Sequence, residues 1–378
     1  MADCRASRWI SRNRQLILYL VSLCTSSVEG ELFRLPHRSK MVTRASALQK
    51  NLKWFGLVHI KIPGLEGQRS LRSFTVQLNF PLPDALTILK NDGNRIMDCF
   101  AAFLQTHAHA PARLLESINY SMSAGGKRLR PALVLETYRA CGGDENADSF
   151  PSALAAATAM EMIHTFSLVH DDLPAMDDDD LRRGNPTNHK VYGQAMAILA
   201  GDALTTMAFA LIATNAEPGK STQLILELAH ATGPEGMIGG QVLDIDGENK
   251  SLSLPDLQQL HRMKTGALLT TSCRLGAIAA GADGNTLAAV TTCGRHLGLA
   301  FQIVDDVLDV TSTPEQMGKA TGKDKDKGKN TYPSLMGLEQ SKAEATRQLE
   351  AALTALAPLK SAAAGLISLA KFVVERDM

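Results

Sequence analysis

Apolar residues recur at helical spacing from about residue 83 onward, and the alternation that is typical of strands is nearly missing. Runs such as SALAAATAMEMI and AMAILAGDALTTMAFALIA are apolar around most of the helix, which indicates central helices packed on all sides. We therefore expect one all-α domain over residues 81–378. The periodicity predicts helices at 84–108, 111–124, 130–141, 150–171, 191–214, 220–231, 235–247, 255–281, 283–311 and 338–358.

Helix breakers fall between these segments. Gly142-Gly143 and Gly281 each follow a predicted helix, and Pro255 stands where a first helical turn is expected. The run KDKDKGKN at 323–330 lacks apolar residues entirely, so we expect a flexible loop there. A run of this kind is by itself usually only a solvated segment, and its interest comes from its position after the helix at 283–311.

The first of two aspartate groups follows the helix at 150–171, in the sequence DDLPAMD. Asp171 and Asp172 follow the apolar run SLVH directly. Pro174 is expected to interrupt the helix after Asp172, because proline cannot continue the hydrogen-bond ladder. The chain can then turn so that Asp177 folds back toward Asp171.

The second group, DDVLD, comes 134 residues later. Asp305 and Asp309 are four residues apart and therefore point the same way from one helix. Carboxylates in such apolar surroundings need partners, because desolvating an isolated carboxylate costs several kcal/mol or more. All-oxygen ligand sets suit Mg²⁺, which completes its octahedron with water and substrate phosphates. The alternative, two solvated acidic turns that cap helices, explains one aspartate per helix but not three.

The sequence also contains clusters of basic residues that could bind a diphosphate. In GGKRLRP (125–131) the paired glycines let backbone amides approach an anion, and Lys127 and Arg130 share a face if a helix follows. Such side chains are what a diphosphate without its own metal requires. Arg182 and Arg183 follow the first aspartate group, and the alternative is that they only neutralise their acidic neighbours.

Other polar residues stand on otherwise apolar helices. His164 lies two turns before Asp171, on the same helix face, although a single histidine there is more often a satisfied core residue. Lys264 and Thr265 occur in HRMKTGALL, and Gln241 occurs with Asp244 in GGQVLDID. All of these residues are candidates for the same polar site.

The charge of the chain is unevenly distributed. The formal net charge is zero, yet residues 1–80 contain 13 Lys and Arg against 4 Asp and Glu, so the remainder is acidic. An acidic body argues against nucleic-acid binding, which needs a basic face. The six cysteines are never two or three residues apart, so CxxC spacing is absent, and we expect free thiols in a reducing compartment.

The leader at 1–80 has no lasting periodicity. Arg8, Arg12 and Arg14 precede the nine-residue apolar run LILYLVSLC, which is too short to span a bilayer. This run could be a signal-peptide core, an organelle transit segment or anchor, or sequence upstream of a later start at Met41 or Met97. We expect a targeting or dispensable segment, no integral membrane span, and a cytoplasmic protein unless the leader directs it to a plastid or mitochondrion.

Five segments, GGKRLRP, DDLPAMDDDDLRRG, HRMKTGALL, FQIVDDVLD and GKNTYP, resemble the signature regions of the short-chain trans-prenyl diphosphate synthases. The resemblance is strongest to bacterial farnesyl diphosphate synthases, and plastid-type geranylgeranyl diphosphate synthases are close relatives. It covers about 81–378 and leaves the leader unexplained. It implies an all-α, isoprenoid-synthase-type bundle around a deep central cavity, usually in a homodimer, and a role in isoprenoid and terpenoid biosynthesis.

The resemblance also implies roles for residues at the matching positions. Three Mg²⁺ ions would bridge the aspartates to an allylic diphosphate, with isopentenyl diphosphate in a second, metal-free site. The implied metal ligands are Asp171, Asp172, Asp177, Asp305 and Asp309. The implied allylic-diphosphate contacts are Arg182, Lys264, Thr265, Gln302, Lys319 and Lys329. The implied isopentenyl diphosphate site is Gly126, Lys127, Arg130, His164 and Arg183. Lys264, Thr265 and Gln241 would take part in catalysis.

The implied reaction is head-to-tail condensation. Metal ions and cations stabilise the departing diphosphate, the allylic C–O bond ionises, and the isopentenyl double bond attacks C1. Phe166 lies five positions before the first motif, about 7.5 Å along the helix from Asp171, and would be the floor that stops the chain at C15. Alternatively, Phe166 is only core packing and the product is geranylgeranyl diphosphate.

Two further classes resemble this pattern less. A terpene cyclase would carry an Asn/Ser/Glu-type second metal motif and would lack the isopentenyl diphosphate site. A regulatory subunit of a heteromeric synthase would normally carry degraded aspartate motifs, and both motifs are intact here.

Overall fold

The computed structural model describes residues 80–248, 250–311 and 330–375, and this part of the chain is mostly helical. An all-α fold is thereby confirmed. The predictions for the leader, Lys319, Lys329 and most of the KDKDKGKN loop lie outside the described residues. The helices are α3 (Ala85–Gln105), α4 (Ala112–Ser123), α5 (Leu129–Ala140), α6 (Phe150–Asp171), α7 (Asn188–Tyr192), α8 (Gln194–Asn215), α9 (Pro218–Thr232), α10 (Met237–Gly247), α11 (Leu254–His261), η1 (Arg262–Gly266), α12 (Ala267–Ala280), α13 (Gly284–Thr311), α16 (Tyr332–Met336), α17 (Leu338–Ala355), η2 (Ala357–Ala363) and α18 (Ala364–Glu375).

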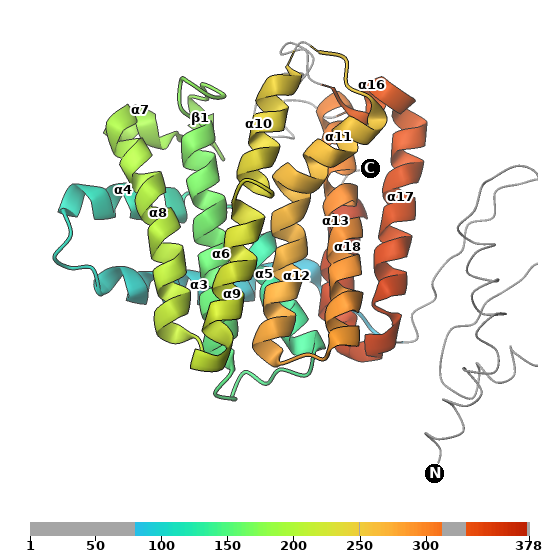
Figure 1. Cartoon of the computed structure of the whole chain (residues 1–378), viewed down its shortest axis with the longest axis horizontal. Helices are drawn as coiled ribbons and strands as arrows, with labels where there is room; N and C mark the ends of the chain where they lie inside the picture. The colour runs from blue at the N-terminus through green and yellow to red at the C-terminus, as the bar shows by residue number, and fades with distance from the viewer. Residues whose placement is uncertain (1–79, 249, 312–329, 376–378) are drawn as a thin grey trace, which may run out of the picture. The chain divides into compact units, whose positions relative to one another are not determined.

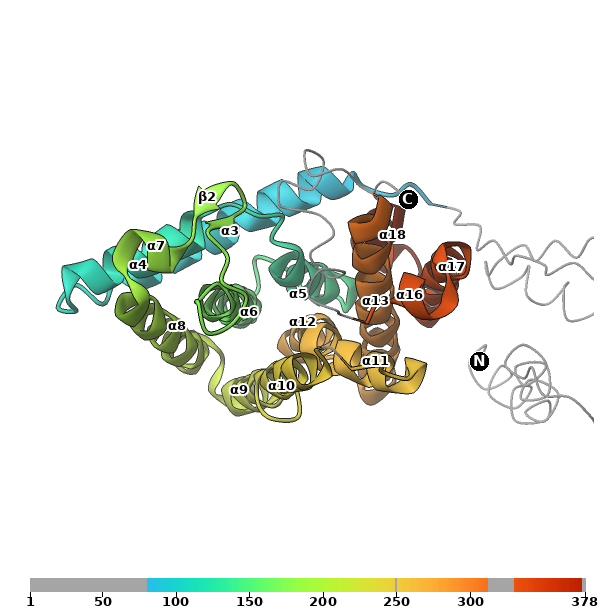
Figure 2. The ribbon, with the colours of Figure 1, turned by 90° about the horizontal axis from the view of Figure 1, so that it is seen from above.

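The helices pack around α6. Most of them run along a common direction, and α3 and α4 cross behind them (Figure 1). The view along the bundle shows α6 enclosed by α5, α8, α9 and α12 (Figure 2), and α6 contacts each of them. Met160, Ile163 and Leu204 belong to the core cluster formed there, and a second cluster surrounds α13. The all-round apolar sequence of α6 therefore reflects its central position.

Local chemistry explains where several helices begin and end. The Asp84 carboxylate accepts a hydrogen bond from the Thr87 amide at 2.8 Å and caps α3. Thr331 and Ser334 form a capping box at the start of α16. Gly281 ends α12 in the left-handed region, with φ 72°. Because these signals involve residues close in sequence, the predicted helix boundaries agree well with the observed ones.

Two features differ from the sequence prediction. No helix was expected beyond residue 358, yet α18 lies there and is buried on most of its surface. The predicted helix at 255–281 is divided into α11 and α12 by the π-helical turn η1. Such turns occur frequently at functional sites.

Four segments, α6, α8, α13 and Ala357–Glu375, are long and apolar enough to cross a membrane by length and composition alone. They differ in how far the bundle buries them. The apolar window of α6 is 78% buried and that of α8 is 44% buried. On α8, Ile198 and Leu199 are exposed beside Ala195. We name these three residues the α8 outer face.

Candidate active site

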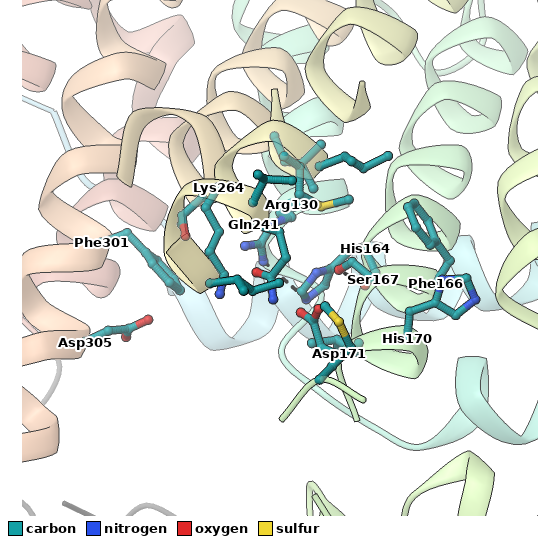
Figure 3. Close-up of a pocket in the computed structure, with 18 residues that line it drawn as sticks. Arg130, His164, Phe166, Ser167, His170, Asp171, Gln241, Lys264, Phe301 and Asp305 are labelled. Carbon is teal, nitrogen blue, oxygen red and sulfur yellow. Dashed lines mark hydrogen bonds between the residues drawn. The ribbon is translucent and has the colours of Figure 1, made fainter. Parts of the chain in front are cut away.

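A cavity of about 560 Å³ opens between α6, α10, η1 and α13. Figure 3 shows Asp171 and Asp305 on different helices, with Lys264, Gln241 and Arg130 between them in this view. Apolar side chains from α6, α10 and α12 line the remainder. Eight predicted site residues line this cavity: Arg130, His164, Phe166, Asp171, Gln241, Lys264, Thr265 and Asp305.

The end of α6 positions the first aspartate group. The helix ends at Asp171, Asp172 is its C-cap, and the Asp177 amide donates to the Asp171 carbonyl at 2.8 Å. The turn predicted from Pro174 is therefore present. Burial raises the pKa of Asp171 to about 6, although Lys264 opposes the shift. A buried carboxylate whose ionised form is disfavoured in this way would be stabilised by a bound cation.

Asp172 faces away from the main cavity. Its side chain is almost fully buried, and its carboxylate accepts a hydrogen bond from Arg182 Nε at 2.9 Å. Arg182 also forms an ion pair with Asp179 at 3.1 Å. Asp172, Arg182 and Arg183 line a smaller neighbouring cavity of about 30 Å³. For Arg182 the structure therefore displays the neutralising contacts that were the alternative interpretation of its sequence position.

The second aspartate group lies near the end of α13. Asp305 lines the main cavity, and Asp309, one turn further on, is half-buried. Asp306 is buried, and its carboxylate accepts hydrogen bonds from Gln302 Nε2 at 2.8 Å and from the Tyr332 amide at 2.9 Å. Adjacent aspartates in one motif thus have different surroundings: Asp306 binds the Tyr332 amide at the start of α16, while Asp305 lines the cavity.

The donor set fits Mg²⁺ only in part. Within the described ranges, no group of three or more His, Cys, Asp or Glu residues is close enough to hold a metal ion. Asp171 and Asp305 nevertheless line the same cavity although 134 residues separate them. Mg²⁺ usually takes one or two carboxylates and completes its shell with water and substrate phosphates. Carboxylates on facing helices therefore fit metal that is shared with a bound diphosphate.

The π-helical turn η1 carries Lys264 and Thr265. Lys264 Nζ contacts Asp244 Oδ2 of α10 at 2.5 Å, and Thr265 Oγ1 donates to Gln302 Oε1 at 2.9 Å. A Cβ on Gly240 would collide with the Lys264 backbone, so glycine is what allows α10 to approach the turn. The turn is thus held from α10 on one side and from α13 on the other.

Gln241 presents an oxygen to the cavity. Its Oε1 atom is buried and has no hydrogen-bond partner in the described structure, and its side chain lines the cavity. A buried polar atom without a partner is costly in a folded protein. Gln241 is therefore positioned to interact with a bound cation or polar ligand group.

Arg130 and His164 form the cationic side of the cavity. Arg130 Nη1 lies 3.3 Å from His164 Nε2, and the Arg130 guanidinium lies 5.8 Å from the centre of the Phe301 ring. Burial, and after it the neighbouring Arg130, lowers the pKa of His164 well below its usual value. His164 is therefore neutral and able to accept a hydrogen bond from Arg130. Its position beside another predicted site residue favours the binding role over that of a core residue.

Gly126 and Arg183 are packed together. Gly126 has a φ of 109°, and a Cβ there would overlap the Arg183 guanidinium, which donates to the Gly125 carbonyl. Arg183 is presented by the hairpin of β1 (Leu181–Arg182) and β2 (Asn185–Pro186), in which Leu181 pairs with Pro186. Lys127 Nζ lies 5.1 Å from the centre of the Phe372 ring. Gly126, Lys127, Asp177, Gln302 and Asp309 line neither of the two cavities described above.

Phe166 lies in the apolar wall. Its side chain is 7% exposed, lines the cavity and also belongs to the core cluster around α6. Its ring meets the His170 ring edge to face, with centroids 5.7 Å apart. His170 Nε2 in turn lies 3.0 Å from the Ile198 carbonyl of α8. Phe166 therefore combines both properties considered from the sequence, cavity lining and core packing.

Carboxylates on two helices, a buried arginine beside a neutral histidine and an apolar wall around one cavity are expected of an all-α enzyme that handles diphosphates. The chain belongs to the polyprenyl synthetase family, whose profile matches residues 111–364. The resemblance found in the five motifs is thereby confirmed.

Several relatives are similar over most of their length. A farnesyl diphosphate synthase from Geobacillus stearothermophilus is 47% identical over 71% of this chain and 90% of its own. A geranylgeranyl diphosphate synthase from Cyanophora paradoxa is 45% identical over 71% and 89%. Among solved structures, an FPP/GFPP synthase from Zymomonas mobilis matches with a TM-score of 0.66 and 34% identity, covering 77% of this chain and 99% of that one.

Proposed function

We infer that the chain is a prenyltransferase that condenses isopentenyl diphosphate with dimethylallyl and then geranyl diphosphate, releasing pyrophosphate and forming farnesyl diphosphate. The observation that carries this function is one cavity lined by Asp171 and Asp305 on facing helices and by Arg130 beside His164. Such a cavity can accept two diphosphates of different kinds, one with metal and one without. The farnesyl and geranylgeranyl synthases among the relatives support the same reaction class.

Asp171 and Asp305 line the same cavity and suit Mg²⁺ that is shared with a bound diphosphate. We propose that Asp171, Asp172, Asp177, Asp305 and Asp309 would hold three such ions. Bound there, Mg²⁺ would neutralise charge on the leaving diphosphate. Asp172 would first have to exchange its contact with Arg182. We assign Lys264, Thr265, Gln302, Arg182, Lys319 and Lys329 to the allylic diphosphate.

The reaction then follows from what these side chains do. Arg130, with Lys127, Gly126, Arg183 and neutral His164, holds isopentenyl diphosphate. The allylic C1–O bond breaks with its electron pair leaving on pyrophosphate, the isopentenyl double bond forms the new bond to C1, and a C2 proton leaves to a diphosphate oxygen. Gln241 and Thr265 direct oxygen dipoles toward the reacting carbon. The apolar wall excludes water that would quench the cation.

A turnover assay with isopentenyl and dimethylallyl diphosphates tests this function. Condensation to longer prenyl diphosphates is expected. Cyclic or hydroxylated terpenes from geranyl or farnesyl diphosphate alone would indicate a terpene cyclase, and a complete lack of turnover would indicate a regulatory subunit.

We propose farnesyl diphosphate as the main product and Phe166, which lines the cavity, as the residue that stops the growing chain. Each added isoprene carries the chain five carbons deeper, and displacing a packed phenyl ring costs about 1 to 3 kcal/mol. Phe166→Ala should therefore move the products to C20 or longer and leave the first condensation nearly unchanged, as followed by product chromatography. A wild type that makes mostly C20 would favour the geranylgeranyl alternative.

We further propose that the enzyme is a homodimer and that the α8 outer face lies in its interface. Ile198 and Leu199 are 45% and 53% exposed on the apolar helix α8, and exposed apolar side chains of this kind are often buried in an interface. Leu199→Asp should shift the mass measured by light scattering toward one chain, whereas a change at the exposed Leu86 of α3 should not. A monomeric wild type would contradict this proposal.

We propose a cytoplasmic enzyme with no membrane span, whose catalytic domain is 81–378. The helices of span length are explained by core packing and by the α8 outer face. The leader 1–80 is proposed to carry targeting information or to be dispensable. Import of a reporter fused to residues 1–80 into a plastid or mitochondrion would replace the cytoplasmic assignment.

A further inference from the structure

A buried ion pair joins Arg128 of the GGKRLRP segment to Glu161 of α6. Arg128 is 8% exposed and its Nη1 donates to Glu161 Oε1 of α6, a residue that is 1% exposed. Neither residue lines the cavities described above. Replacing a buried pair by apolar residues is often neutral or stabilising, so stability alone is a weak explanation for keeping one.

Arg128 also has an unusual backbone. Its φ and ψ of 52° and 37° are left-handed, a conformation that non-glycine residues rarely adopt, and it stands immediately before α5. Strained backbone of this kind persists only where the surroundings over-determine it, and it concentrates at functional sites. Here Nη2 donates to the Met122 carbonyl near the end of α4, while the side-chain stem passes beside Gly93 of α3. Three helices therefore fix one residue.

The fixed residue separates two proposed ligands of isopentenyl diphosphate. Lys127 precedes Arg128, and Arg130 follows it in the first turn of α5. On α6, Glu161 lies one turn before His164, which contacts Arg130 at 3.3 Å. The same helix thus holds the segment at two points, through the ion pair and through the imidazole.

We propose that the Arg128–Glu161 pair is a positioning device that holds the left-handed turn so that Lys127 and Arg130 act on one diphosphate. The proposal rests on the function inferred above. It names no new contact with substrate, because Arg128 is directed into the bundle and not into the cavity. It accounts for the presence of a charged, strained residue where glycine would relieve the backbone.

A double variant that keeps the net charge of the chain tests the positioning role. In Arg128→Met with Glu161→Leu one positive and one negative charge disappear together, and apolar side chains fill the buried space. We expect the Michaelis constant for isopentenyl diphosphate to rise roughly tenfold or more, because misplaced binding groups lose much of their effect. The Michaelis constant for geranyl diphosphate and kcat at saturating isopentenyl diphosphate should stay within about threefold.

The matched control is Arg274→Met with Glu227→Leu, a pair that links α12 to α9 and does not contact the GGKRLRP segment. It should leave both Michaelis constants unchanged. Equal effects of the two double variants, or an unchanged constant for isopentenyl diphosphate in the first, would overturn the proposal. Should the first not fold, Arg128→Gly replaces it, because glycine keeps the turn without strain but lacks the tether. The same rise in the Michaelis constant is expected.

Calorimetric binding of isopentenyl diphosphate in EDTA distinguishes this inference from the proposed function. If the wild type binds isopentenyl diphosphate and the variant binds it about tenfold more weakly, the positioning role stands even if no condensation occurs. If the wild type condenses both substrates and the variant binds normally, the function stands and the positioning role fails. A wild type that does not bind isopentenyl diphosphate would contradict both.

Discussion

The cations that line the main cavity and its smaller neighbour form two groups that differ in their partners. Lys264 is paired with Asp244 at 2.5 Å, and Arg182 is paired with Asp172 and Asp179. Of the cations assigned to the allylic diphosphate, the two that the structure describes are thus already paired with carboxylates. This side of the site has acidic character, and an incoming diphosphate would be repelled unless it carried its own positive charge.

The other group is different. Among the described residues Arg130 contacts the neutral His164, and Arg183 donates to the Gly125 carbonyl, and neither forms an ion pair there. Burial lowers the pKa of both guanidinium groups, which means that their surroundings do not fully compensate the charge. The two groups thus differ in their direct partners: Lys264 and Arg182 contact carboxylates, whereas Glu161 acts on Arg130 and Arg183 only from a distance. We infer that the first group favours a diphosphate that arrives with metal and the second group a bare one.

The largest expected effect comes from removing a carboxylate on the acidic side. Asp171→Ala or Asp305→Ala should lower kcat by two or more orders of magnitude, because the stabilisation of leaving-group charge is lost. Metal-free Asp171→Ala should melt no lower than the wild type at pH 8. The folded-state pKa of about 6 lies above the ordinary 3.8, so the ionised carboxylate costs stability above pH 6.

The control for these variants is Asp180→Ala. Asp180 belongs to the same acidic run but is largely exposed and pairs with Lys190 on the surface. The kcat of the Asp180→Ala variant should be close to that of the wild type. A near-normal kcat in the folded Asp171→Ala or Asp305→Ala variant would contradict the role assigned to that carboxylate.

Removing one cation from each group should raise the Michaelis constant of one substrate and leave that of the other nearly unchanged. Arg130→Ala is expected to raise the constant for isopentenyl diphosphate by roughly ten- to a hundredfold, because a charge-assisted contact contributes about 1.5 to 3 kcal/mol. Lys264→Ala should act mainly on the allylic substrate. Steady-state kinetics with each substrate varied in turn would measure this, and equal effects on both constants would show that the pockets are wrongly assigned.

Metal removal should sharpen the same contrast with smaller effects. With EDTA, the dissociation constant for isopentenyl diphosphate should change less than about threefold, while that for geranyl diphosphate should weaken about tenfold or more. Calorimetry with magnesium restored gives the reference values. If isopentenyl diphosphate needed metal equally, the contrast between bare and paired cations would have no functional meaning.

The smallest effect is expected from deleting the basic leader. A chain that begins near Phe80 should keep both Michaelis constants and its oligomeric mass, because a segment without periodicity is not required by the helical core. Kinetics and light scattering on the shortened chain would measure this. Loss of folding would mean that the leader packs on the domain. Its excess positive charge would then have to be counted together with the two groups of cations in the site.

The sequence by itself determined the local features of this protein. The spacing of apolar residues predicted most helices, and Pro174 predicted the turn that brings the Asp177 amide to the Asp171 carbonyl. These features depend on residues within a few positions of each other, where helix geometry and proline sterics act directly. The motif spacing was likewise sufficient to indicate the family.

Tertiary structure alone decided which charges meet. Lys264 finds Asp244 across 20 residues, and Arg128 finds Glu161 across 33, because helix packing and not sequence distance sets these neighbours. The close approach of α10 to the π-helical turn at Lys264 requires a glycine at position 240, and no periodicity reveals this contact. Asp305 and Asp306 are adjacent in sequence, yet a 100° rotation per residue points one into the cavity and the other toward the Tyr332 amide.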